Sequence, residues 1–118
     1  MPGFASAGDD TFACDAYTNG TAYYYAGTTH CYPVDGSPPA MSSISDEPSL
    51  YKYDPSSMDY NVVASTFSMC WICWLDSAPA SNGFGSGDYI VTDNYAVVAP
   101  PGYSGSDAGL VSLAFYVS

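Results

Sequence analysis

Positive charge is almost absent from the sequence. Lys52 is the single lysine, there is no arginine, and His30 is the single histidine, against twelve carboxylates and a formal net charge of −11. Proteins that bind nucleic acid or anionic membranes draw much of their affinity from lysine and arginine on phosphate groups. Phosphoryl-transfer sites use the same cations. The composition therefore excludes nucleic acid, an anionic membrane surface and phosphate chemistry.

Targeting and membrane-spanning segments are also lacking. The N-terminal residues 1–4 carry no basic group and no apolar run of signal-peptide length follows them. The most apolar stretch, residues 62–75, is interrupted by Ser65, Thr66 and Ser68 and is too short to cross a bilayer as a helix. We therefore expect a protein that is made in the cytoplasm and does not enter a membrane.

Catalytic motifs are missing as well. Nucleophilic catalysis needs a base and a group that orients it, and His30 is the one histidine on offer. No spacing among the carboxylates selects a pair for acid–base work. Acidic loops at residues 54–59 and at Asp88 and Asp93 offer oxygen ligands, but no calcium-loop pattern accompanies them. We expect no catalytic residue, no cofactor and no metal.

The four cysteines are Cys14, Cys31, Cys70 and Cys73. In an extended strand, Cys70 and Cys73 would point to opposite faces with about 10 Å of backbone between them, so we expect that they do not pair. Buried thiols that act as small apolar side chains are the preferred interpretation. The alternative is a Cys14–Cys31 disulfide that closes the first hairpin. Two disulfides would favour a secreted protein.

What the chain does contain is material for one β domain. It has 118 residues, of which 47% are apolar and 16% aromatic, with twelve tyrosines. These values predict an N-terminal arm at residues 1–10 and a single domain at residues 11–118. Residues 11–18 and 21–26 flank Asn19-Gly20, a pair typical of a type I′ hairpin turn.

Prolines and apolar alternation predict the rest of the fold. Five prolines within residues 27–59 predict a long irregular loop with at most a short strand at residues 50–53. Residues 60–75 are apolar on both faces, which favours a central strand covered on both sides, with a helix as the alternative. A second hairpin is expected at residues 88–92 and 95–99, turning at Asp93-Asn94, and a last strand at residues 110–117.

The predicted fold class is therefore all-β. We expect a small sandwich or barrel of five to seven short antiparallel strands joined by long loops rich in proline and glycine.

Aromatic side chains are the strongest indication of function. Tyr23, Tyr24 and Tyr25 alternate between two faces of a strand, so at least one ring faces outward. Tyrosine is common in protein–protein contacts. The alternative is that these rings cover a thin core. The predicted interface residues are Tyr23, Tyr24, Tyr25, Tyr51, Tyr53, Phe115 and Tyr116.

In size, acidity and expected β architecture, the chain resembles the capsid decoration (cement) proteins of tailed viruses. That resemblance implies a non-enzymatic structural protein on the virion surface, made in the host cytoplasm. Its partners would be further copies of itself, as a homo-oligomer, and a shell or scaffold protein. The alternative is an extracellular adhesion or carbohydrate-binding module with disulfides, in which tyrosines act as stacking platforms.

Overall fold

The computed structural model describes residues 3–8, 11–34, 36 and 38–118, and these residues form nine β-strands. The strands are β1 (Gly3–Gly8), β2 (Phe12–Gly20), β3 (Tyr24–Pro33), β4 (Met41–Asp54), β5 (Asp59–Ser65), β6 (Ser68–Cys73), β7 (Leu75–Ser81), β8 (Gly87–Val98) and β9 (Asp107–Val117). The predicted all-β class is confirmed. The strand count is higher than the expected five to seven.

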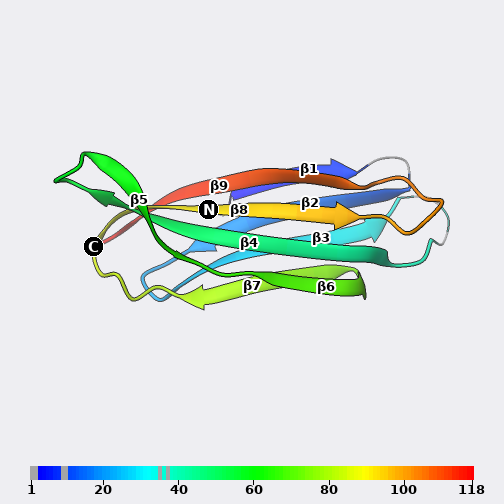
Figure 1. Ribbon diagram of the computed structural model, residues 1–118, viewed down its shortest axis with the longest axis horizontal. Coiled ribbons are helices and arrows are strands. Elements are labelled where there is room, and N and C mark those ends of the chain that lie inside the picture. Colours follow the sequence, from blue (N-terminus) through cyan, green and yellow to red (C-terminus); the bar gives the residue numbers. More distant parts are fainter. Residues whose placement is uncertain (1–2, 9–10, 35, 37) are drawn as a thin grey trace.

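The strands form two antiparallel sheets that pack face to face as an elongated sandwich of 52 × 21 × 19 Å (Figure 1). Sheet A has the order β1-β2-β3-β7, and sheet B has the order β5-β4-β8-β9. Strand β6 pairs with the same edge of β4 as β5 does. Strand β6 leads directly into β7, and the chain thereby crosses from sheet B to sheet A.

Residues 3–8 of the predicted N-terminal arm form strand β1, which pairs with β2. The remaining arm residues 1–2 and 9–10 lie outside the described residues.

The prediction of a long irregular loop at residues 27–59 is wrong, because strands β3 and β4 occupy most of that range. Strand β4 tolerates Pro48 because this residue lies at the point where the neighbouring strand changes from β6 to β5. Its pairing with β6 ends at Asp46 and its pairing with β5 begins at Ser49. At this break the Thr66 N–H donates to the Pro48 carbonyl (3.0 Å), so the missing proline N–H faces a gap in the ladder.

The first hairpin is present, but its turn is not at Asn19-Gly20. Gly20 pairs with Tyr25, and the turn comprises residues 21–24. The Thr21 N–H donates to the Tyr24 carbonyl (2.8 Å), and the Thr21 hydroxyl accepts from the N–H groups of Tyr23 and Tyr24 (both 3.1 Å). Gly20 serves packing instead, because a Cβ there would overlap with the ring of Phe115.

The predicted second hairpin is also wrong, since residues 87–98 form the single strand β8. Asp93 lies in the middle of β8 with 0% of its surface exposed, and is not a turn residue. The predicted last strand is present as β9.

The buried apolar side chains divide into two larger clusters along the strands. The disulfide cluster contains Phe12, Cys14, Cys31, Met41, Ile44, Val97 and Ala99. The tyrosine cluster contains Tyr25, Leu50, Tyr89 and Val91. A small third cluster contains Ala16, Tyr95 and Val111. Along β4 the buried positions run Ile44, Asp46, Pro48 and Leu50, so the strand passes from one large cluster to the other through an aspartate.

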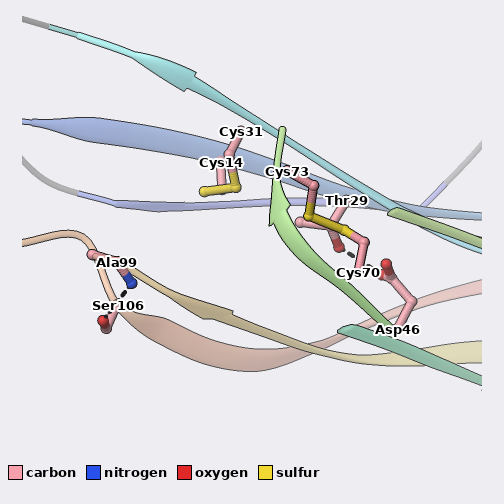
Figure 2. The surroundings of a disulfide bond; sticks show 8 residues. All are labelled: Cys14, Thr29, Cys31, Asp46, Cys70, Cys73, Ala99 and Ser106. Carbon is pink, nitrogen blue, oxygen red and sulfur yellow. Dashed lines mark hydrogen bonds between the residues drawn. A yellow bond between two sulfur atoms is a disulfide. The ribbon is translucent and has the colours of Figure 1, made fainter. Parts of the chain in front are cut away.

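Three buried aspartates and a threonine fill the space between these clusters. We call Asp46, Asp76, Asp93 and Thr29 the aspartate layer. The Thr29 hydroxyl of sheet A donates to Asp46 Oδ1 of sheet B at 2.6 Å (Figure 2). Asp76 Oδ1 accepts from the Ser68 hydroxyl at 2.8 Å. The interior therefore has a polar centre between two apolar regions.

We predict that Gly20→Ala destabilises the sandwich. The added methyl group would overlap with Phe115, whose ring is stacked on Tyr89 (5.2 Å between ring centroids). Overpacking of this kind lowers the free energy of unfolding by about 1–3 kcal/mol, measurable by urea denaturation. Gly83→Ala is the matched control, because nothing lies within 4 Å of a Cβ at that position. Equal losses in both variants would contradict the packing role of Gly20.

Candidate contact surface

The most apolar segment of the chain lies at an edge of the sandwich and not at its centre. Strands β5 and β6 pair with β4 on one side, and many of their apolar side chains are exposed. Trp71 is 70% exposed and Ile72 is 80% exposed. The prediction of a central strand covered on both sides is therefore wrong. Only the inner half of the segment packs against the core, through Val63, Ala64, Cys70, Cys73 and Trp74.

The exposed side chains of β6 share one face with neighbouring strands of sheet B. Met69 pairs with Ser45, which in turn pairs with Ala96. Trp71 pairs with Ser43, which pairs with Val98. Since paired residues in antiparallel strands point to the same face, Met69 and Trp71 lie in two adjacent rows on the outside of sheet B.

A shallow groove of about 590 Å³ lies beside these rows. Phe67, at the junction of β5 and β6, lines it together with Leu110 of β9. The other lining residues are Ser45, Glu47, Asn94, Tyr95, Ala96, Ala108 and Gly109. We define the outer apolar surface as Phe67, Met69, Trp71, Val98 and Leu110, all of which are exposed.

Charge is sparse on this surface. Glu47 is the only carboxylate among the described residues that line the groove. The single lysine lies elsewhere, where Lys52 Nζ donates to the Phe84 carbonyl (2.5 Å) and sits 5.7 Å from the centre of the Tyr89 ring. The outer apolar surface is therefore a neutral, aromatic area on a strongly acidic protein.

The predicted interface residues are distributed over several elements. Tyr23 and Tyr24 lie at the turn between β2 and β3, and Tyr116 is exposed on β9. Tyr51 and Tyr53 of β4 are half-buried.

Two of these predicted residues face inward. Tyr25 belongs to the tyrosine cluster and Phe115 packs against that cluster. Strand alternation turns both side chains inward, so that Tyr25 is buried and Phe115 is partly buried.

The sequence did not predict the exposed positions of Phe67, Met69 and Trp71. An apolar strand with two apolar faces has the same pattern whether it is central or at an edge. The sequence signal for the break is the polar pair Ser65 and Thr66. At this point the pairing with β4 ends for β5, and it begins again with β6 at Ser68.

All four cysteines are paired, so the expectation of free thiols is wrong. Cys14 and Cys31 are directly opposite one another on β2 and β3, with their Cα atoms 4.0 Å apart, and form the disulfide considered as the alternative. Cys70 and Cys73 form a second disulfide with Cα atoms 6.1 Å apart (Figure 2). The expectation that they do not pair fails because Ile72 has a positive φ of 53°, which bends the backbone and shortens the distance expected for a straight strand.

The remaining sequence candidates do not form a site. His30 is exposed on β3, with its ring 5.9 Å from that of Tyr32. Asp54 accepts hydrogen bonds from the Ser56 hydroxyl (2.7 Å) and N–H (2.9 Å), and these bonds lower the pKa of its carboxyl. Within residues 3–8, 11–34, 36 and 38–118, no three His, Cys, Asp or Glu side chains are arranged to hold a metal ion.

No helix in the described part of the chain is long and apolar enough to cross a membrane.

Comparisons with known proteins give little. No family model matches the chain, and no curated protein matches it. Among solved structures, the chain is similar to FetP of uropathogenic Escherichia coli strain F11, with a TM-score of 0.41 and 12% sequence identity. That alignment covers 99% of this chain and 95% of the FetP chain. A similarity of this size carries no argument about function.

We predict that the two disulfides contribute unequally to stability. The Cys14–Cys31 bond joins residues 17 positions apart and the Cys70–Cys73 bond joins residues 3 positions apart. Loop-closure entropy then gives a loss of about 3 kcal/mol for the Cys14→Ala, Cys31→Ala double variant and about 2 kcal/mol for the Cys70→Ala, Cys73→Ala double variant. Guanidinium denaturation measures both values, and a larger loss in the second variant would contradict the ranking.

Proposed function

We propose that this protein is a non-enzymatic structural protein that acts by binding another protein through the outer apolar surface, in an oxidising, extracellular setting. The observation that supports this most is the exposure of Phe67, Met69 and Trp71 side by side on one sheet face. A contiguous exposed apolar area on a small domain is typical of a site that another molecule covers.

The composition of the surface favours a protein as the partner. The centres of protein interfaces are enriched in aromatic residues and methionine and depleted of charge. Phe67, Met69 and Trp71 meet that description, and the small side chains of Ser45, Ala96 and Ala108 beside them leave the sheet face flat. A flat sheet face that offers large apolar side chains suits another folded surface.

The charge of the chain favours a partner with a basic rim around an apolar centre. The whole chain carries a net charge of −11 whereas the outer apolar surface is itself neutral, so positive charges at the rim of the partner would add attraction. Two copies of this chain would bring like charges together. The predicted homo-oligomer stays a prediction, and we expect it to need salt that screens the repulsion.

The two disulfides support an oxidising location, because cytosolic thiols are kept reduced. They favour the secreted alternative over a protein that stays in the cytoplasm. A virion surface meets the same oxidising conditions after release, so the capsid decoration role remains a second proposal. In both proposals the shell, scaffold or host protein is bound by the same sheet face.

We predict that Trp71→Ala weakens partner binding without unfolding the protein. A photo-reactive amino acid at position 71 would identify the partner by cross-linking, and the purified partner would then be bound to each variant. Loss of a central aromatic contact raises the dissociation constant about tenfold or more. Because Trp71 is exposed, we expect its free energy of unfolding to change by less than about 0.5 kcal/mol.

Met58→Ala is the control, since Met58 is 79% exposed in the turn between β4 and β5 and is not part of the outer apolar surface. It should change the dissociation constant less than threefold. Equal weakening by both variants would contradict the proposed surface. Binding of a polysaccharide that is abolished by Trp71→Ala, with no protein cross-linked at position 71, would replace the protein partner with the carbohydrate alternative. Light scattering at low and high salt tests self-association.

A further inference from the structure

The aspartate layer is the feature of the interior that the proposed contact function does not use. Asp46 and Asp93 are 0% exposed and Asp76 is 5% exposed. They come from three different strands, β4, β8 and β7, so the layer is assembled only when the two sheets pack together. Three acidic groups in one apolar interior would repel each other strongly if all were ionised.

The layer is built into the fold and is not an accident of a loose loop. Gly27 of β3 faces Asp93, and a Cβ at Gly27 would overlap with the Asp93 carboxyl group. The glycine therefore leaves the space that this carboxyl group occupies. Thr29, two residues along the same strand, donates its hydroxyl hydrogen bond to Asp46 at 2.6 Å.

Within the described residues, no positive side chain compensates these carboxylates. Lys52, the only lysine, is held by the Phe84 carbonyl at the surface, and His30 is exposed on β3. The side chains that surround the layer from the packed elements are neutral or acidic. By strand pairing they include Thr18 of β2, Gly27 and Thr29 of β3, Pro48 of β4, Ser68 of β6, Ala78 of β7, Tyr95 of β8 and Val111 of β9, with Glu47 of β4 exposed nearby.

Several carboxylate oxygens also lack a donor. Asp46 Oδ2, Asp76 Oδ2 and both oxygens of Asp93 are buried without a hydrogen-bond partner among the described residues. A buried carboxylate that has neither a cation nor a donor binds a proton, which neutralises it and supplies a donor for its neighbour.

The pKa shifts of Asp46 and Asp93 are in the direction expected for carboxyl groups that keep a proton. Burial first, and then the neighbouring Asp93 and Asp76 carboxyls, raise the pKa of Asp46 to about 10, although the hydrogen bond from Thr29 acts in the opposite direction. Burial also raises the pKa of Asp93.

We propose that the aspartate layer is a proton-binding site whose contribution to the packing of the two sheets is greatest in acid and falls steadily as the pH rises toward the alkaline range. In the folded protein, a protonated carboxyl group donates to an ionised neighbour, and the Thr29 hydroxyl fixes the orientation of Asp46. The layer thereby makes the stability of this fold respond to pH.

Proton linkage determines whether the free energy of unfolding rises or falls with pH. An unfolded aspartate has a pKa of about 4, whereas the pKa of Asp46 in the folded protein is about 10. Between these values the folded state holds a proton that the unfolded state has lost. The unfolding equilibrium constant therefore rises with pH, by up to tenfold per pH unit for each proton retained.

Urea denaturation of the wild type and of Asp46→Asn between pH 5 and pH 9 tests the proposal. Asparagine cannot ionise, yet its oxygen accepts from Thr29 and its NH₂ group donates to the neighbouring carboxylates. We expect the wild-type unfolding constant to rise at least tenfold from pH 6 to pH 8. Asp46→Asn should have a slope lower by about one proton.

Asp88→Asn is the matched control, because Asp88 is an exposed aspartate on the same strand as Asp93. It removes one charge from the surface and should keep the wild-type slope. Measurements at low and high salt separate the layer from general surface repulsion, which salt screens. A slope in Asp46→Asn equal to that of the wild type would overturn the proposal.

Two further measurements keep the test decisive. If Asp46→Asn does not fold, the infrared C=O band of a protonated carboxyl group in wild-type protein at pH 7 is the readout, since exposed aspartates are ionised there. Absence of that band would overturn the proposal.

The pH series is also run with EDTA and with CaCl₂. If calcium removes the pH dependence of the wild type, the layer binds a cation and not a proton, and the proposal fails.

Discussion

The hydrogen bond from Thr29 to Asp46 connects the two sheets at the polar centre of the sandwich, and the arrangement of the interior depends on it (Figure 2). Strand side chains alternate between faces, so a shift of β4 by one residue would place Asp46 outside and polar Ser45 inside. A buried carboxyl group tolerates few alternative positions, because it must keep its partners. The aspartate layer therefore specifies the register of β4 against its neighbours.

The same layer limits the apolar core. It separates the disulfide cluster from the tyrosine cluster, and the body of the sandwich is only 21 by 19 Å across. A narrow sandwich of this kind cannot enclose every large apolar side chain of the chain. Phe67, Met69 and Trp71 consequently lie on the outside of sheet B, where they form the surface that we propose binds a partner. The divided core and the exposed apolar side chains are thus two consequences of one constraint.

The two disulfides reinforce one region of this divided interior. The Cys14–Cys31 bond belongs to the disulfide cluster, and Cys70 and Cys73 pack against it (Figure 2). The tyrosine cluster has no such cross-link and is held by ring packing, including the Tyr89 and Phe115 pair. The second disulfide also fixes the bend at Ile72 where the chain crosses from sheet B to sheet A. Cross-links therefore secure the part of the sandwich that carries the exposed aromatic strand.

By itself, the sequence determined the all-β class, the first hairpin and the last strand, because alternation of apolar and polar residues is a local property of a strand. The shortage of lysine and arginine also predicts that nucleic acid is not a partner. Only the tertiary structure decided where Asp93, Pro48 and Trp71 lie. The sequence predicts a turn at Asp93, because it does not show that Gly27 of another strand leaves space for a buried carboxyl group. It predicts a strand break at Pro48, because it does not show that the partner of β4 changes at this residue. Whether Trp71 is covered depends on which strands lie beside β6, and that depends on contacts between residues far apart in the chain.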